Sequence, residues 1–131
     1  MSDQPLRGSI ITSQLIASIA TRTTLETPGV LRLEPTVQGF LARLAPAALQ
    51  NLRTAGSQDG TYRHGGVTAT IRDGSAHVHL DIATDIAYTA LQVAEAVQRR
   101  VRESISHTGL TPGTVDITIL AIEPHRGTAM L

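Results

Sequence analysis

The stretch Val67-Thr-Ala-Thr-Ile-Arg-Asp-Gly-Ser-Ala-His-Val-His-Leu-Asp-Ile82 decides the fold class of this chain. Apolar residues occupy every second position on either side of Asp73-Gly74, a pattern typical of strands with one buried face. An Asp-Gly pair is a favoured two-residue turn between antiparallel strands. The stretch therefore predicts a β-hairpin in which one set of alternating side chains faces a core: Val67, Ile71, Val78, Leu80 and Ile82.

A long helix is predicted after this hairpin, followed by a closing strand. Asp85 is suited to cap the start of the helix, and Gly109 is suited to the left-handed conformation that ends many helices. The run Val115–Ile122 predicts the closing strand, with Val115, Ile117 and Ile119 facing the core. The helix closes that core with an apolar stripe, which consists of Ile86, Ala90, Val93, Ala94, Val97, Val101 and Ile105.

The first half of the chain repeats the order strand, helix, strand. The pattern predicts a short strand over 8–12, a helix over about 14–26 and a second strand over 30–34. In the helix, Leu15, Ile16, Ile19 and Ala20 share one face. A further helix over 36–52 and a flexible loop at about 54–66 precede the hairpin.

This order of elements predicts an α+β fold, a small mostly antiparallel sheet with helices packed on one face. We expect one domain over residues 8–124, flanked by a flexible tail at 1–7 and another tail at 125–131. The length of 131 residues is enough for one core and too short for two.

Composition narrows the class of function. No apolar run is long enough to cross a bilayer, and the N-terminus lacks the pattern of a secretory signal, so we expect a cytoplasmic protein. The eleven basic residues, all arginine, balance eleven acidic ones, and aromatic residues make up 2% of the chain. Nucleic-acid binders usually carry a basic excess and stacking aromatics, so this balance counts against that role.

The sequence offers little that supports catalysis. There is no cysteine, no lysine for a phosphate-binding loop and no Gly-x-Gly-x-x-Gly pattern. Gly56-Ser57 lacks the second glycine and the preceding strand that mark a nucleophilic serine. We therefore predict neither enzymatic activity nor a cofactor.

Two polar motifs remain as candidate sites. His77, His79 and Asp81 alternate along one strand, so they share a face and could hold a divalent metal; the plainer interpretation, which we favour, is the polar face of a half-buried strand without a metal. The tract Arg99-Arg100-x-Arg102 could grip phosphate or an acidic partner, or could be a solvated helix face.

The sheet is also a candidate interaction surface. Thr68 and Thr70 lie on its predicted outward face, and Leu120 and Ile122 place apolar groups on the same side of the closing strand. Strand edges and uncharged faces of this kind can pair with another chain. We therefore expect self-association, or docking on a related protein, through the sheet edge or its outward face.

The second half of the chain resembles a known family. The succession Gly66–Ile71, Asp73-Gly74, Val78–Ile82, Val97-Gln98-x-x-Val101, Thr108–Leu110 and Val115–Ile119 is similar to the alkaline-shock-protein, or general-stress-protein, family of Gram-positive envelope stress response proteins. Gly8–Ile11 and Thr27–Val30 agree with the start of that family. Two departures are the missing glycine at the entry to the long helix and the segment 36–65, which matches no family feature. The all-arginine composition favours an actinobacterial member.

The resemblance implies a non-enzymatic cytoplasmic protein of envelope stress or homeostasis. It implies a homo-oligomer held at the inner face of the cell membrane by a related, membrane-anchored partner, with no direct insertion into the membrane and no nucleic-acid partner. A small RNA-binding α/β domain is the alternative, because the strand and helix content suits one. That alternative lacks a GXXG loop, stacking aromatics and a basic excess.

Overall fold

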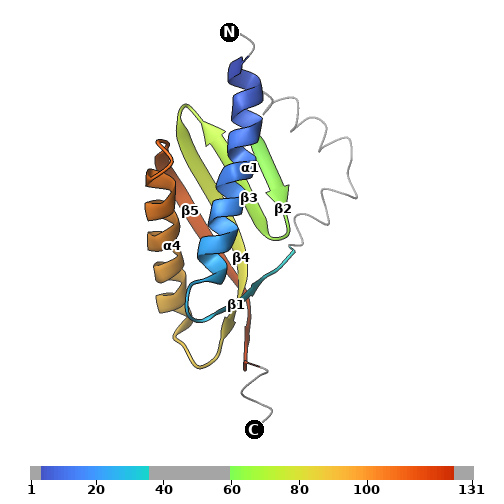
Figure 1. Cartoon of the computed structure of the whole chain (residues 1–131). Helices are drawn as coiled ribbons and strands as arrows, with labels where there is room; N and C mark the ends of the chain where they lie inside the picture. The colour runs from blue at the N-terminus through green and yellow to red at the C-terminus, as the bar shows by residue number, and fades with distance from the viewer. Residues whose placement is uncertain (1–3, 36–59, 126–131) are drawn as a thin grey trace.

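The computed structural model describes residues 4–35 and 60–125 of the chain (Figure 1). Two helices and five strands follow one another in these ranges: α1 (Gln4–Leu25), β1 (Val30–Leu33), β2 (Thr61–His64), β3 (Val67–Arg72), β4 (Ser75–Asp85), α4 (Ala90–Ser106) and β5 (Thr111–Glu123). No described helix is both long and apolar enough to cross a membrane.

Strand β4 is the centre of a five-stranded sheet. Strand β5 pairs with it in parallel over its whole length, from Ser75 opposite Thr111 to Asp85 opposite Glu123. On its other edge β3 pairs with residues 75–80 and β1 with residues 82–84, both antiparallel, and β2 extends the sheet beyond β3. Three of the four pairings are antiparallel, which confirms the predicted α+β class.

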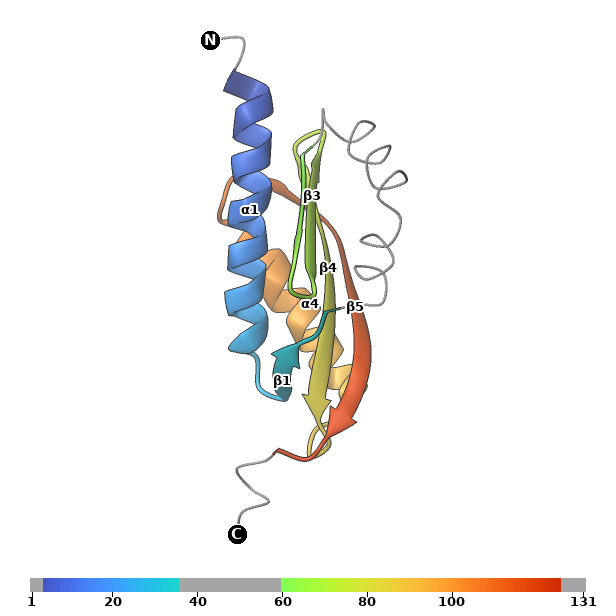
Figure 2. The same cartoon turned by 90° about the vertical axis from the view of Figure 1, so that its right-hand side faces the viewer.

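Both helices pack against one face of this sheet (Figure 2). Register places Val78 opposite both Ala69 and Val115, so the alternating apolar residues of three strands form one continuous layer. The predicted core is confirmed, although Ile117 and Ile119 are only partly buried. The buried cluster contains Ile16, Ala17, Ala20, Val67, Ala69, Ile71, Ala76, Val78, Leu80, Ile82, Val93, Val97, Val101, Ile105 and Val115.

The hairpin between β3 and β4 forms as predicted. Asp73 and Gly74 have φ angles of 52° and 77°, and Arg72 lies opposite Ser75. Two consecutive positive φ angles define the turn whose twist matches that of the flanking strands. The dipeptide therefore determined this part of the register.

Helix α1 corrects the prediction for the N-terminal region. It begins at Gln4, so the predicted strand over 8–12 is wrong and the helix also includes residues 4–7 of the predicted tail. Leu15 is 53% exposed, whereas Ser13, Ile16, Ala20 and others at helical spacing are buried. The β-branched pair at 10–11 suggested a strand, but a preference of two residues is weak against a continuous helix whose later turns pack on the core.

The predicted loop at 54–66 is corrected in its second part. Residues 61–64 form β2, and the turn from β2 to β3 contains Gly65 and Gly66, both with positive φ. A Cβ at Gly66 would lie 2.4 Å from the carbonyl oxygen of Glu34, so only glycine fits where β1 ends beside β3. The predicted helix over 36–52 and residues 54–59 lie outside the described residues.

The start of the long helix also differs from the prediction. Helix α4 begins at Ala90 with Thr89 as its N-cap residue, and Ile86 is 64% exposed instead of joining the apolar stripe. The Asp85 carboxylate accepts a hydrogen bond from the backbone N–H of Ala87 at 2.9 Å. This local turn competes with helix formation, as short polar side chains often do.

Candidate functional site

The edge of β5 is divided into two unlike parts. Among the described residues β5 pairs only with β4, and α4 runs beside it in the opposite direction (Figure 1). Gln98 donates its side-chain N–H to the Val115 carbonyl at 2.8 Å, and Arg102 donates to the Gly113 carbonyl at 2.7 Å. We call residues 111–116 the capped half of β5, because side chains of α4 occupy its outer carbonyls.

Residues 117–122 form the open half. Four helix residues advance about 6 Å, close to the roughly 6.6 Å of two strand residues, so Arg102 and Gln98 meet alternate carbonyls. Ala94 is the next residue of the same helix stripe, four residues before Gln98, and alanine has no side-chain donor. In the part of the chain that the structure describes, no side chain donates to a carbonyl of the open half. Among residues 4–35 and 60–125, side-chain capping of this edge therefore stops at Val115.

The open half is also uncharged and apolar. Its sequence, Ile117-Thr-Ile-Leu-Ala-Ile122, combines high strand propensity with neither charge nor proline, the composition of segments that pair readily with other strands. Leu120 and Ile122 are 48% and 52% exposed. Among the described residues, five of the seven exposed large apolar side chains belong to the open half or to residues 86–91: Ile86, Tyr88, Leu91, Leu120 and Ile122.

A bulge separates Leu120 from Ile122. The register passes from Ile82 opposite Ile119 directly to Ala83 opposite Ala121, which leaves Leu120 as the extra residue. Ile122 then lies opposite Thr84, a buried residue of the helix-covered side, so the prediction that both apolar residues point outward is wrong for Ile122. A prediction from alternation along the sequence cannot detect an extra residue of this kind, and the extra residue reverses the side on which later residues lie.

The two histidines lie on the outward face but separate into different contacts. Nε2 of His79 is 3.0 Å from Oδ1 of Asp81, which is buried, and 3.4 Å from the Thr118 hydroxyl. His77 instead accepts a hydrogen bond from the backbone N–H of Thr114 at 3.1 Å through Nδ1. Within residues 4–35 and 60–125 no three His, Cys, Asp or Glu side chains form a metal-binding group. The absence of a metal stays a prediction.

The two threonines of the predicted surface contribute to cross-strand hydrogen bonds. The Thr70 hydroxyl accepts from the hydroxyl of Thr61, and the Thr68 hydroxyl accepts from Nε of Arg63, each at 3.3 Å. Both are only partly exposed. They tie β2 to β3 and lie two strands away from the open half of β5.

The structure divides the arginine tract. Arg102 is one of the two caps of β5, whereas Arg99 and Arg100 line a hollow of about 300 Å³ between α4 and the turn after α1. The other residues around this hollow are Pro28, Tyr88, Gln92, Val93 and Ala96. Sequence reasoning missed Gln98, although its spacing of four from Arg102 placed both polar side chains on one helix face.

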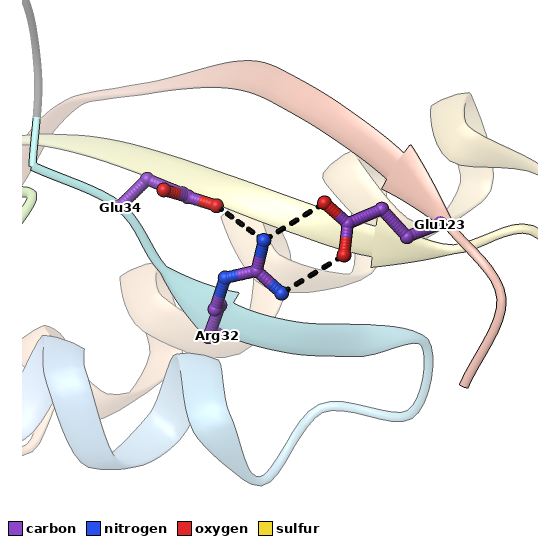
Figure 3. Close-up of polar contacts among 3 residues, drawn as sticks. All are labelled: Arg32, Glu34 and Glu123. Carbon is purple, nitrogen blue, oxygen red and sulfur yellow. Dashed lines mark hydrogen bonds and ion pairs between the residues drawn. The ribbon is translucent and has the colours of Figure 1, made fainter. Parts of the chain in front are cut away.

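An ion cluster holds the far end of β5 (Figure 3). Arg32 of β1 binds both carboxylate oxygens of Glu123, at 3.0 and 2.8 Å, and also approaches Glu34 at 2.7 Å. The hydrogen bonds with Glu123 raise the pKa of the Arg32 guanidinium above its ordinary value. This contact connects β1 to β5 across β4, directly after the last residue of the open half.

No protein-family model, curated protein or solved structure matches the chain. Its function is therefore inferred from its own residues and their arrangement.

Proposed function

We propose that this protein is a non-enzymatic interaction protein that self-associates by pairing the open half of β5 with a second copy. The same edge would dock on a related, membrane-anchored protein, in the envelope stress role that the resemblance to the alkaline-shock family implies. The observation that carries the proposal is the uncharged edge at residues 117–122, which no described side chain caps, beside a capped half of the same strand.

Strand addition suits the chemistry of this edge. A partner strand would satisfy the outer backbone groups of the open half and cover its apolar side chains. Burying the exposed half of Ile86, Leu91, Leu120 and Ile122 in both copies contributes roughly 6–12 kcal/mol, since full burial contributes about 1.5–3 kcal/mol per side chain. Association costs about 4–15 kcal/mol, so the expected self-association is weak and depends on concentration.

The sheet face supports a binding role more than a catalytic one. His79 and Asp81 do not line the hollow beside α4, and the Asp81 carboxylate is buried and already bound to His79. Active sites are usually concave, with several polar groups converging on one point. This arrangement favours an interaction protein.

Sedimentation velocity over a wide concentration range tests the proposal. The parent should show a species that grows with concentration, and a variant with Leu120→Asp and Ile122→Lys should stay monomeric. Leu15→Asp is the matched control, because Leu15 is about as exposed as Leu120 but lies on α1. The Leu15→Asp variant should associate like the parent. A parent that is monomeric throughout and binds no membrane-anchored relative from cell extract would contradict the proposal.

A further inference from the structure

The hollow beside α4 is a second candidate site, on the side of the helix away from the capping residues. Residues 92, 96, 99 and 100 recur at helical spacing on α4, and Pro28 and Tyr88, from outside the helix, complete the lining. Gln98 and Arg102 belong to a different stripe of the same helix, the one that faces β5. The hollow is therefore separate from the open half.

The apolar wall of the hollow is built into the backbone. Gly29 has a φ of 94°, and a Cβ there would lie 2.6 Å from Cγ2 of Val93 and 3.0 Å from Cγ of Tyr88. The ring of Tyr88 thus packs on bare backbone. The backbone N–H of Tyr88 donates to the Asp85 carbonyl at 3.0 Å, so the turn that carries the ring is itself hydrogen-bonded.

The rim of the hollow carries two unused positive charges. In the described part of the chain neither Arg99 nor Arg100 forms an ion pair or hydrogen bond, although Glu95 and Glu103 are each four residues from Arg99. A guanidinium offers five donors in a planar fork that matches a carboxylate. Two adjacent forks beside an apolar wall select an anion attached to an apolar group.

The dimensions favour a peptide over a membrane surface. About 300 Å³ lies at the lower end of ligand pockets, enough for one aliphatic side chain and a neighbouring carboxylate. Recognition of anionic lipid usually needs a cluster of about 4–8 basic residues, and only two line this hollow. A concave wall also suits an inserted side chain more than a flat bilayer.

We infer that this hollow binds an acidic peptide segment of a partner protein, in which a carboxylate on Arg99 and Arg100 lies next to an apolar side chain against Tyr88, Val93 and Pro28. Binding leaves the edge of β5 free. The protein thus presents two surfaces, one for strand pairing and one for an acidic peptide.

The test is an NMR titration of ¹⁵N-labelled protein with the capped peptide acetyl-Ala-Leu-Glu-Ala-amide. The protein should carry Leu120→Asp and Ile122→Lys, so that the result does not depend on self-association. Peptide should shift the backbone amides of residue 29 and residues 88–100. The peptide with Gln in place of Glu should bind about tenfold more weakly, because it lacks the charge.

Variants in the protein complete the test. Arg99→Gln with Arg100→Gln should weaken binding of the Glu peptide about tenfold, while Arg72→Gln, at the distant β3–β4 hairpin, should leave it unchanged. Unaltered melting temperatures would show that the variants fold. The inference would be overturned if the Glu and Gln peptides bound equally well, or if up to about 10 mM peptide caused no shift. It would also be overturned if no peptide bound and the double substitution instead abolished binding to phosphatidylglycerol vesicles.

Discussion

The capped and open halves of β5 belong to one strand and pair with the same neighbour, yet their outer edges differ. Side chains of α4 occupy the carbonyls of Gly113 and Val115, and nothing comparable reaches residues 117–122 in the described chain. The difference shows that a helix beside an edge strand protects the carbonyls of that strand only in part. Protection occurs where the helix carries side-chain donors that match alternate strand residues.

The largest expected effect concerns the core beneath the capped half. Ile105, in the last turn of α4, is fully buried, so Ile105→Ala should lower the free energy of unfolding by about 2–5 kcal/mol through lost burial and a cavity. Leu120→Ala in the open half should change it by less than about 0.5 kcal/mol. Urea denaturation of dilute protein measures both. Similar losses from the two variants would contradict the distinction.

Removing the caps should convert the capped half into an open one. Gln98→Leu with Arg102→Leu leaves two carbonyls of β5 without donors, and each hydrogen bond contributes about 0.5–1.5 kcal/mol to stability. The expected outcome is a less stable monomer with stronger self-association, because the pairing edge becomes longer. Sedimentation velocity beside urea denaturation checks this. Self-association equal to the parent's would show that α4 does not limit the edge.

Adding a cap should shorten the open half. Ala94 precedes Gln98 by four residues on α4, so we expect a glutamine at this position to reach the carbonyl of Ile117. Ala94→Gln should then weaken self-association several-fold, by about 1 kcal/mol. Ala94→Leu is the matched control for size and should not weaken it. Unchanged self-association of the glutamine variant would refute the proposed spacing.

The smallest effect concerns the ion cluster at the end of the open half. The pKa of Arg32 is higher in the folded state than in the unfolded state. The contribution of the ion pair to stability is therefore complete below the unfolded-state pKa, and it is lost only as the pH rises through the folded-state pKa. The difference in melting temperature between parent and Arg32→Gln should therefore stay constant from about pH 7 to pH 10. It should shrink with added salt, because the pair is exposed. If the difference in melting temperature changed with pH in this range, the raised pKa of Arg32 would be wrong.

Local pattern predicted much of the fold correctly. Alternation along β3 and β4, the Asp73-Gly74 turn and the stripe of α4 each depend on residues close in sequence, so the core could be identified before its partners were known. The errors arose where local signals were short or ambiguous. Two β-branched residues suggested a strand inside α1, and a glycine-rich segment concealed β2.

The sequence by itself determined the hairpin, the buried face of the sheet and the uncharged run 117–122, because each follows from periodicity or composition. Only the tertiary structure decided which part of β5 is capped and which is open. The reason is that capping depends on how α4 is aligned with β5. This alignment places Arg102 and Gln98 beside the carbonyls of Gly113 and Val115, whereas Ala94, the next residue of the stripe, has no donor. In the same alignment Arg102 faces the strand, whereas Arg99 and Arg100 line the hollow. The sequence of the tract alone does not show which arginine contacts which site.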